Sequence, residues 1–291
     1  MDAVTEESWR IPQPREVEAA RAVLDGRRWL VLTGAGVSTD SGIPDYRGPG
    51  APPRTPMTYQ QLLSGPEAQQ RYWARAHLGW SRMGRAEPGP THHALVALEM
   101  AGRLSGLITQ NVDGLHRRAG HRDVIELHGC VDTVVCLDCG DRTSRARLQR
   151  RLELLNPGWT EQDVEVAPDG DAVLESTATF RVADCERCGG RLKPDVVFFG
   201  ENVPKDRVER CYRLTDEAEA LVVLGSSLQV MSGLRFVRRA RANGTPVVIV
   251  NRGATRGDDC ADARVDGGCA ETLAAIAYGR PVQPSTHRRP A

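Results

Sequence analysis

The chain has 291 residues, 40% of them hydrophobic and 26% charged, and its 38 basic and 38 acidic residues give a formal net charge of zero. This composition is typical of a globular enzyme-sized chain, and it provides no overall positive field for nucleic acid or an anionic membrane. Neither a secretory leader nor an apolar run of about 18 residues is visible, so we expect a cytoplasmic protein without a membrane span.

Six short apolar runs predict buried strands of a parallel sheet, because such strands read as continuous rather than alternating. They lie at residues 29–33, 107–109, 124–127, 196–199, 221–224 and 247–250. Helical patterns occur between several of them, at residues 14–25, 92–101, 207–219 and 234–242. This alternation predicts an α/β fold with a Rossmann-like, doubly wound parallel sheet.

A glycine-rich turn follows the first predicted strand. Gly34, Ala35 and Gly36 lead into Val37 and Ser38. A strand, a Gly-x-Gly turn and a helix start together bring backbone N–H groups against a pyrophosphate. The third glycine of the usual fingerprint is missing, and no acidic residue follows about 20 positions later, so a hydride-transfer dehydrogenase is disfavoured.

The next segment, SGIPDYR at residues 41–47, does not continue as an ordinary first helix. It offers Arg47 to a phosphate and Asp45 to a polar partner. The alternative interpretation is a surface loop with a local ion pair.

Polar residues also follow later strands. TQNVD at 109–113 and ELHG at 126–129 end two of them, and Gly225-Ser226-Ser227 and Asn251-Arg252-Gly253 end two more. Ligands of open α/β sheets bind outside the carboxyl ends of the strands. Amides and a carboxylate there suit a carboxamide or ribose hydroxyls, and His128 suits general base catalysis near neutral pH.

Two CxxC pairs predict a metal site. They are Cys136/Cys139 and Cys185/Cys188, each followed directly by a glycine. Two intervening residues let both thiolates reach one tetrahedral ion, and the glycine permits the tight turn behind them. Four thiolates leave no open coordination position, so we expect one structural zinc ion inside an inserted module. A redox pair is the weaker alternative, because redox chemistry needs only one CxxC.

Several of these motifs occur together, in this order, in a known family. They are GAGVSTDSGIPDYR (34–47), TQNVDGLH (109–116), ELHG (126–129), both CxxC pairs, KPDVVFFGE (193–201), LGSSL (224–228) and IVN (249–251). The chain therefore resembles the sirtuins over nearly all of residues 15–280. RYWARAHLGW (71–80) and LNPGW (155–159) resemble the class II branch, which includes the fourth, mitochondrial human sirtuin, and a bacterial member is expected.

The resemblance implies a catalytic domain at 14–280, preceded by an N-terminal extension at 1–13 and followed by a tail at 281–291 that we expect to be disordered. A large Rossmann-like part would comprise residues 14–48, 91–130 and 192–280. A small part would comprise a helical segment at 49–90 and the zinc module at 131–191. NAD and an acylated lysine would meet between the two parts.

Carried onto matching positions, the resemblance implies a set of NAD-contacting residues. They are Gly34, Ala35, Gly36, Ser38, Ile43, Asp45, Tyr46, Arg47, Gln110, Asn111, Val112, Asp113, Gly225, Ser226, Ser227, Asn251, Arg252, Gly253 and Cys269. The phosphates would lie against the glycine turn and Arg47, and nicotinamide against Asp45, Asn111 and Asp113. Val197, Phe199, Gly200 and Glu201 would lie along the substrate peptide, added as a strand.

The implied activity is NAD-dependent protein-lysine deacylation, with transfer of the acyl group to ADP-ribose and release of nicotinamide. His128 would be the base that takes a proton from a ribose hydroxyl, and Asn111 and Asp113 would complete the catalytic set. The implied partners are acylated-lysine proteins, acted on by a monomer, with no nucleic acid and no membrane.

The pair Tyr72 and Arg75 departs from plain deacetylases. The two residues share one face if this segment is helical. Sirtuins that prefer acidic acyl chains carry a Tyr-x-x-Arg pair, so these residues would read a carboxylate or a long polar acyl chain such as glutaryl or lipoyl. The alternative is surface packing beside an exposed charge.

Three further functions remain open on the sequence. Mono-ADP-ribosyl transfer to protein is a second enzymatic possibility. A non-catalytic NAD-sensing module is disfavoured by the intact His128, Asn111 and Asp113. A zinc-ribbon nucleic-acid binder is disfavoured by the zero net charge.

Overall fold

A computed structural model describes residues 12–46, 56–159 and 177–278 of the chain. The described chain divides into two compact units. The first unit comprises Met1–Val37, Pro90–Leu107 and Cys211–Ala291, and the second comprises Ser38–Gly89 and Ile108–Arg210. The domain bounds expected from the sequence stay a prediction, and the expected tail at 281–291 lies outside the described residues.

The first unit is built from alternating strands and helices. Its elements are α1 (Pro14–Leu24), β1 (Trp29–Thr33), the 3₁₀ turn η1 (Ala35–Val37), α4 (Pro90–Met100), β2 (Leu104–Thr109), α7 (Lys205–Asp216), β7 (Ala220–Leu224), α8 (Met231–Ala242), β8 (Val247–Asn251), η3 (Asp258–Cys260), β9 (Ala263–Asp266) and α9 (Cys269–Tyr278). Of these, β2 and α7 cross into the second unit.

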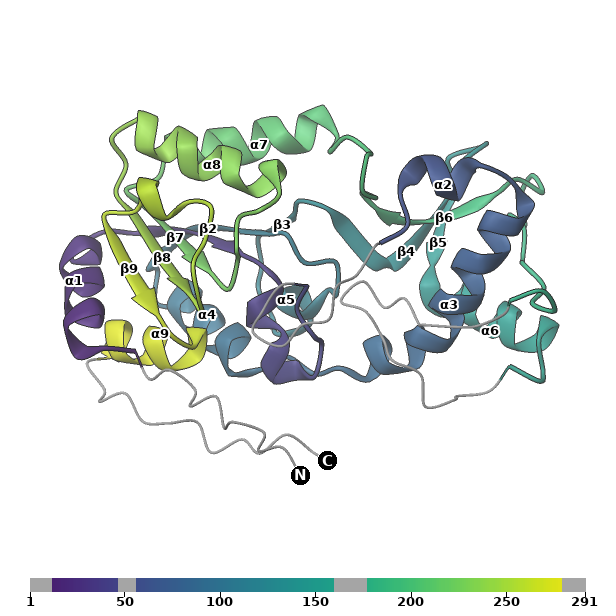
Figure 1. Cartoon of the computed structure of the whole chain (residues 1–291), viewed down its shortest axis with the longest axis horizontal. Helices are drawn as coiled ribbons and strands as arrows, with labels where there is room; N and C mark the ends of the chain where they lie inside the picture. The colour runs from purple at the N-terminus through teal and green to yellow at the C-terminus, as the bar shows by residue number, and fades with distance from the viewer. Residues whose placement is uncertain (1–11, 47–55, 160–176, 279–291) are drawn as a thin grey trace, which may run out of the picture. The chain divides into compact units, whose positions relative to one another are not determined.

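The large sheet has the strand order β3-β2-β1-β7-β8-β9, with β3 at Val124–Glu126. β1 pairs parallel with β7, β7 with β8, and β8 with β9. All residues of β1, β7 and β8 are buried, as expected for a sheet covered on both faces. Helices α1, α4 and α9 lie on one side of these strands and α8 on the other (Figure 1). The predicted doubly wound α/β fold is confirmed.

The second unit contains a small antiparallel sheet and several helices. Its elements are η2 (Thr39–Ser41), α2 (Tyr59–Leu63), α3 (Pro66–Arg85), α5 (Leu115–Arg118), β4 (Gly129–Cys136), β5 (Arg142–Ser144), α6 (Arg145–Leu155) and β6 (Leu192–Val196). The sheet has the order β5-β4-β6. Trp73 of α3, Leu148 and Leu152 of α6 and Phe180 fill the core against Val134 of β4.

One predicted strand is wrong. The apolar run 196–199 was expected in the parallel sheet, but the strand there is β6, which ends at Val196 and pairs antiparallel with β4. The backbone turns away after Val197, because the amide of Phe198 donates 2.9 Å to the Glu201 carboxylate and Gly200 adopts a φ of +78°. An apolar run alone does not reveal such a turn.

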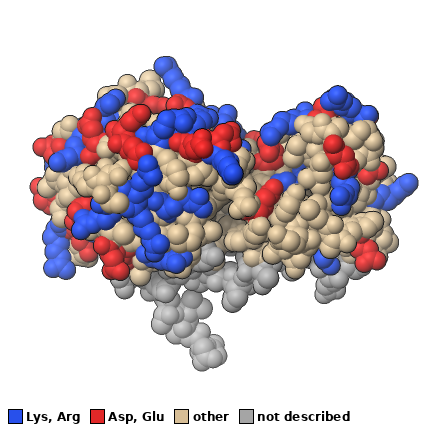
Figure 2. Space-filling model, turned by 90° about the horizontal axis from the view of Figure 1, so that it is seen from above, with Lys and Arg blue, Asp and Glu red and all other residues tan. Residues whose placement is uncertain are grey.

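The surface of the described chain carries charges of both signs. Acidic and basic side chains are interspersed on the face seen in Figure 2. Within the described ranges, no helix combines the length and the apolarity needed to cross a membrane.

Candidate functional site

The glycine turn packs directly against the end of β7. A Cβ on Gly34 would lie 2.7 Å from Cβ of Ser226, and one on Gly36 would lie 2.9 Å from Cα of Gly225. The Gly36 amide donates 2.8 Å to the carbonyl of Gly225, which itself has a φ of +59°. Glycine is required at these positions because two backbones approach more closely than any side chain allows.

Ala35 differs from its two neighbours. The Gly34 and Gly36 amides donate to carbonyls at the end of β7, whereas the Ala35 amide has no acceptor among the described residues. It lies at the first position of η1, immediately after β1. A free N–H at the start of a helical turn and at the carboxyl end of a parallel strand is suited to an anionic phosphate.

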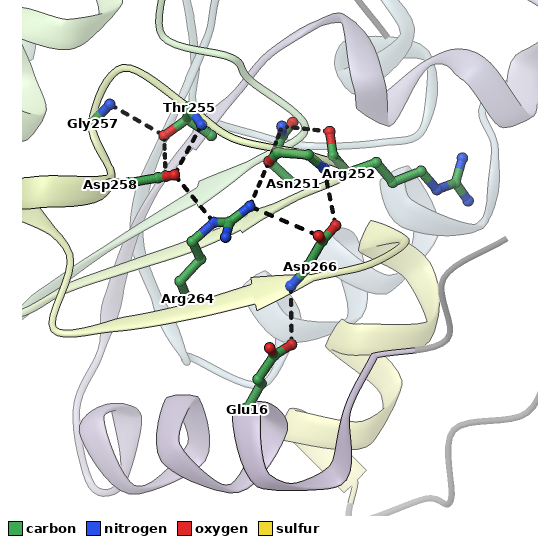
Figure 3. Close-up of polar contacts among 9 residues, drawn as sticks. Glu16, Asn251, Arg252, Thr255, Gly257, Asp258, Arg264 and Asp266 are labelled. Carbon is green, nitrogen blue, oxygen red and sulfur yellow. Dashed lines mark hydrogen bonds and ion pairs between the residues drawn. The ribbon is translucent and has the colours of Figure 1, made fainter. Parts of the chain in front are cut away.

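The carboxyl end of β8 is held by hydrogen bonds within its own loop. The carboxamide Nδ2 of Asn251 donates 2.9 Å to the Arg252 carbonyl and 3.2 Å to the Gly253 carbonyl (Figure 3). The Gly253 amide donates 2.9 Å to Asp266 at the end of β9. Cys269 is buried at the start of α9, with its sulfur 4.0 Å from the Val250 carbonyl. These residues, which the resemblance predicts to contact NAD, therefore form a structured edge.

Arg264 braces the same loop from β9. Its Nη2 donates 2.8 Å to the Gly253 carbonyl, and its Nε lies 3.3 Å from a carboxylate oxygen of Asp258 (Figure 3). Asp258 in turn accepts the amide and the hydroxyl of Thr255. Sequence reasoning missed Arg264 and Asp258, because no motif spacing marks a side chain that acts across two strands.

In the second unit, Ser38 and Asp113 are buried and form one hydrogen-bonded network with the half-buried Asn111. The Ser38 hydroxyl donates 2.7 Å to Asp113 and accepts 3.0 Å from the Asn111 carboxamide. The other Asp113 oxygen accepts 2.9 Å from the Leu115 amide. Burial raises the pKa of Asp113, while these hydrogen bonds oppose that rise. The structure brings these three predicted residues together and shows that Asp113 holds Ser38, which orients Asn111.

His128 has a fixed ring orientation. Its Nδ1 lies 2.8 Å from the Gln110 carbonyl, an acceptor only, so Nδ1 carries the proton and donates it. The neutral ring therefore presents Nε2 as its acceptor. The backbone carbonyl of His128 accepts 2.8 Å from the Val197 amide, which fixes the start of β4 against the segment after β6.

Gly129 allows the close approach beside His128. Its φ is +82°, and a Cβ there would lie 1.9 Å from the Asp195 carbonyl oxygen. No other residue fits this position without moving one of the two strands. The sequence shows a glycine directly after the strand-end histidine, but the close approach of the Asp195 backbone, which requires that glycine, is visible only in the structure.

The segment after β6 joins the helix pair at α2. The Tyr59 amide donates 2.9 Å to the Phe199 carbonyl, and the Gln60 carboxamide donates 3.2 Å to the Gly200 carbonyl. Glu201 accepts Lys193 Nζ at 3.0 Å, so its carboxylate is engaged within the protein. Phe199 is 38% exposed, which leaves an aromatic face open to a ligand.

The loop after the glycine turn is only partly described. Ile43 is buried at 5% exposure and its amide donates 3.2 Å to the Ser38 carbonyl. Asp45 and Tyr46 are half-buried, and the Tyr46 ring lies 6.3 Å from that of Phe199. Arg47 lies outside the described residues.

Tyr72 and Arg75 both lie on α3, as predicted. The Tyr72 ring makes edge contacts with Trp73 and Phe198, at centroid distances of 5.1 and 5.4 Å. A small cavity opens beside it, lined by Tyr72, Ala76, Trp80, Met83, Val131, Arg145 and Pro194. Arg75 is half-buried and does not line this cavity.

The two CxxC pairs form matching turns. In each, the glycine after the second cysteine has a φ of +71°. The Gly140 amide donates 3.1 Å to the Cys136 carbonyl, and the Gly189 amide donates 2.8 Å to the Cys185 carbonyl. Both turns therefore point two thiols toward a common centre.

The four sulfurs fit a tetrahedral ion. They all lie within 4.8 Å of one another, with Cys136 and Cys188 3.5 Å apart and Cys139 and Cys185 3.8 Å apart. Sulfurs bound to zinc at about 2.3 Å in tetrahedral geometry lie about 3.8 Å from each other. The cluster is thus able to bind a structural zinc ion, as the spacing predicted.

Comparison with known proteins gives a consistent result over most of the chain. A model of the Sir2 family matches residues 34–232. The chain is 59% identical over 261 residues to NAD-dependent protein deacetylase 1 of Mycobacterium avium, covering 88% of this chain and 93% of the relative. It is 46% identical over 266 residues to the human NAD-dependent protein lipoamidase sirtuin-4, mitochondrial, covering 89% and 85%. A solved Sir2 mutant with a p53 peptide and NAD matches with a TM-score of 0.72 and 31% identity, covering 90% and 98%.

Proposed function

The chain belongs to the Sir2 family, as its motifs indicated, and we propose that it removes acyl groups from protein lysine side chains in an NAD-dependent reaction. The acyl group passes to ADP-ribose and nicotinamide is released. The Mycobacterium avium relative is named a deacetylase and the human relative a lipoamidase. Relatives of this chain are therefore named for the removal of more than one kind of acyl group.

The orientation of His128 carries the proposal. A hydrogen bond to the Gln110 carbonyl commits Nδ1 as a donor, which leaves Nε2 basic. Nε2 is the atom that takes a proton from a substrate hydroxyl in general base catalysis. Because the ring is held before any ligand binds, little reorganisation is needed at the moment of reaction.

The residues present fit NAD. The close packing of Gly34 and Gly36 on Gly225 fixes the turn after β1, and the free Ala35 amide in that turn is a donor suited to a pyrophosphate. Bound NAD supplies the ADP-ribose group that accepts the acyl chain. On the protein side, the Ser38 hydroxyl fixes the Asn111 carboxamide, which is suited to hydrogen-bond a nicotinamide amide.

The substrate peptide is assigned to the segment after β6. Val197 is tied to His128 through a 2.8 Å backbone bond, so an acyl-lysine beside Val197 lies next to the base. The exposed ring of Phe199 offers an apolar contact to the lysine stem. Glu201, whose carboxylate accepts Lys193 and Phe198, acts by holding this segment in place.

The test is an acyl-lysine peptide panel with NAD, analysed by mass. Nicotinamide and acyl-ADP-ribose formed in equal amounts would support deacylation. ADP-ribose carried on protein, without acyl-ADP-ribose, would instead support mono-ADP-ribosyl transfer. Absence of nicotinamide release with every acyl peptide would exclude both and leave an NAD-binding module.

The remaining expectations form part of this proposal. They are a cytoplasmic monomer that acts on acylated proteins and binds no nucleic acid. The balanced charge of the chain and the mixed surface in Figure 2 support the last of these. Light scattering in solution tests the monomer, and a titration with duplex DNA at low salt tests the lack of nucleic-acid binding.

A further inference from the structure

Strand β9 directs two charged side chains at the loop that follows β8. The Gly253 amide donates 2.9 Å to a carboxylate oxygen of Asp266, and the Gly253 carbonyl accepts 2.8 Å from Nη2 of Arg264 (Figure 3). Both backbone polar groups of Gly253 are therefore bonded to side chains of the neighbouring strand. The proposed reaction uses neither Arg264 nor Asp266.

These two hydrogen bonds hold Gly253 where packing does not. Its φ of +81° lies in the left-handed region, and no atom beyond its chain neighbours lies within 4 Å of the place that a Cβ would take. Glycine is conformationally permissive, so a glycine without packing contacts does not keep one orientation by itself. Arg264 and Asp266 thus supply an orientation that the local sequence does not.

The two charged side chains are themselves fixed. Nε of Arg264 lies 3.3 Å from a carboxylate oxygen of Asp258, which also accepts the Thr255 amide at 3.1 Å. The Asp266 amide donates 3.2 Å to Glu16 of α1. The side chains of Arg264 and Asp266 are 36% and 14% exposed. They therefore reach Gly253 from a braced strand.

The Gly253 carbonyl in turn sets the orientation of the Asn251 carboxamide. Nδ2 of Asn251 donates 3.2 Å to this carbonyl and 2.9 Å to the Arg252 carbonyl. Carbonyls only accept, so the nitrogen faces them and both of its hydrogens are used. The side-chain oxygen accepts from nothing in the described part of the chain and is open to solvent, although Asn251 as a whole is only 9% exposed. Asn251 therefore presents an acceptor, and no donor, to a ligand.

The place of Asn251 in the sheet fits the sugar of a nucleotide. The turn that offers the Ala35 amide to a phosphate follows β1, and the strand order β1-β7-β8 puts β8 two strands away. Neighbouring strands lie about 4.8 Å apart, so the end of β8 is about 10 Å from that turn. A nucleoside attached to the phosphate reaches this far along the carboxyl ends of the strands, where open α/β sheets bind ligands. Its ribose hydroxyls are donors that the Asn251 oxygen can accept.

We propose that Arg264 and Asp266 are positioning residues for the adenosine end of NAD. They fix the Gly253 peptide, the Gly253 carbonyl fixes the carboxamide of Asn251, and the Asn251 oxygen accepts a hydroxyl of the adenosine ribose. Without either charged side chain, Gly253 loses its fixed orientation and the carboxamide is no longer held with its oxygen outward. This inference rests on the proposed use of NAD and adds residues that act on it without touching it.

Analogues of NAD that lack one adenosine hydroxyl test the proposal. Affinities for NAD and for its adenosine 2′-deoxy and 3′-deoxy analogues are measured by calorimetry without an acyl peptide. The wild-type protein should bind NAD more tightly than at least one analogue. Arg264→Met should raise the Kd for NAD by about 2- to 12-fold, the equivalent of one hydrogen bond, and should leave the Kd for that analogue nearly unchanged.

Control variants separate positioning from general stability. Arg241 forms an ion pair with Asp262, which accepts the Val247 amide at the opposite end of β8. Arg241→Met removes this pair and should leave all three affinities unchanged. Arg264→Lys retains a donor and should keep part of the discrimination. Asp266→Asn keeps an acceptor for the Gly253 amide and should bind NAD more tightly than Asp266→Ala.

Turnover of an acyl-lysine peptide gives a second measurement. The adenosine is not the reacting part of NAD, so Arg264→Met should raise KM for NAD and leave kcat nearly unchanged. The inference is overturned if Arg264→Met binds NAD as tightly as the wild type. It is also overturned if this variant binds NAD and both analogues more weakly by the same factor, because that result indicates a general loss of structure.

The calorimetry keeps the inference separate from the proposed function. A wild-type protein that binds NAD but turns over no acyl-lysine peptide would contradict deacylation alone, and the three affinities would still report on Arg264. A wild-type protein that binds NAD and both analogues equally would overturn the inference and leave deacylation standing. A wild-type protein that binds no NAD would overturn both.

Discussion

Replacement of His128 by alanine tests the central feature of the site. The Nδ1 atom of the side chain donates 2.8 Å to the Gln110 carbonyl, and the side chain is half-buried. Loss of a single such bond costs about 0.5–1.5 kcal/mol of folding free energy. The backbone carbonyl, which accepts the Val197 amide, is retained in the variant. His128→Ala should therefore fold and bind NAD.

The effect on catalysis should be much larger. Removal of a positioned general base lowers a rate by about 10²–10⁴, which corresponds to about 3–5 kcal/mol in activation free energy. The assay measures acyl-ADP-ribose formation by mass, together with thermal unfolding and NAD affinity. His93→Ala, at an exposed histidine on α4, is the matched control and should behave as the wild type. Deacylation by His128→Ala at a rate near that of the wild type would refute the assigned role.

Three further outcomes follow from the structure. Removal of the bound metal by a chelator should abolish activity through loss of structure, since metal binding to such sites contributes on the order of 10 kcal/mol to folding; a metal-free protein with unchanged circular dichroism and activity contradicts this. Gly129→Ala should lower the free energy of unfolding, measured with denaturant, by several kcal/mol, because its Cβ would lie 1.9 Å from the Asp195 carbonyl oxygen. The control Gly158→Ala has open space around it and should be tolerated. Hydrogen bonds from Arg239 lower the pKa of Asp216, so this pair stabilises the protein above the ordinary aspartate pKa, and that contribution is lost as the pH falls through the lowered value. Asp216→Asn should therefore weaken the acid dependence of stability, and an unchanged dependence would count against the pair.

The sheet was largely predictable from the sequence. Strands 29–33, 221–224 and 247–250 are buried on both faces, so each reads as an uninterrupted apolar run. The small antiparallel sheet was not predicted. Its β4 strand alternates between buried and half-exposed positions, and β5 has only three residues and none fully buried. Periodicity gives little signal in strands so short and so partly exposed.

Site residues next to one another in sequence were easier to predict than residues that meet in space. The CxxC spacing led directly to the sulfur cluster, because the local turn geometry sets both thiols of each pair. His128 was found from its place at a strand end. Ser38 was predicted among the NAD-contacting residues, but its bridge between Asn111 and Asp113 depends on packing that no local pattern records.

The residues expected to contact the acyl chain also show that sequence spacing does not reveal which side chains meet in space. Helical spacing places Tyr72 and Arg75 on one face of α3, which made them a plausible recognition pair. A guanidinium recognises a carboxylate only if it is desolvated and not already neutralised, and spacing reports neither condition. Arg75 is half-buried and does not line the cavity beside Tyr72, so a shared helix face alone does not establish a recognition pair.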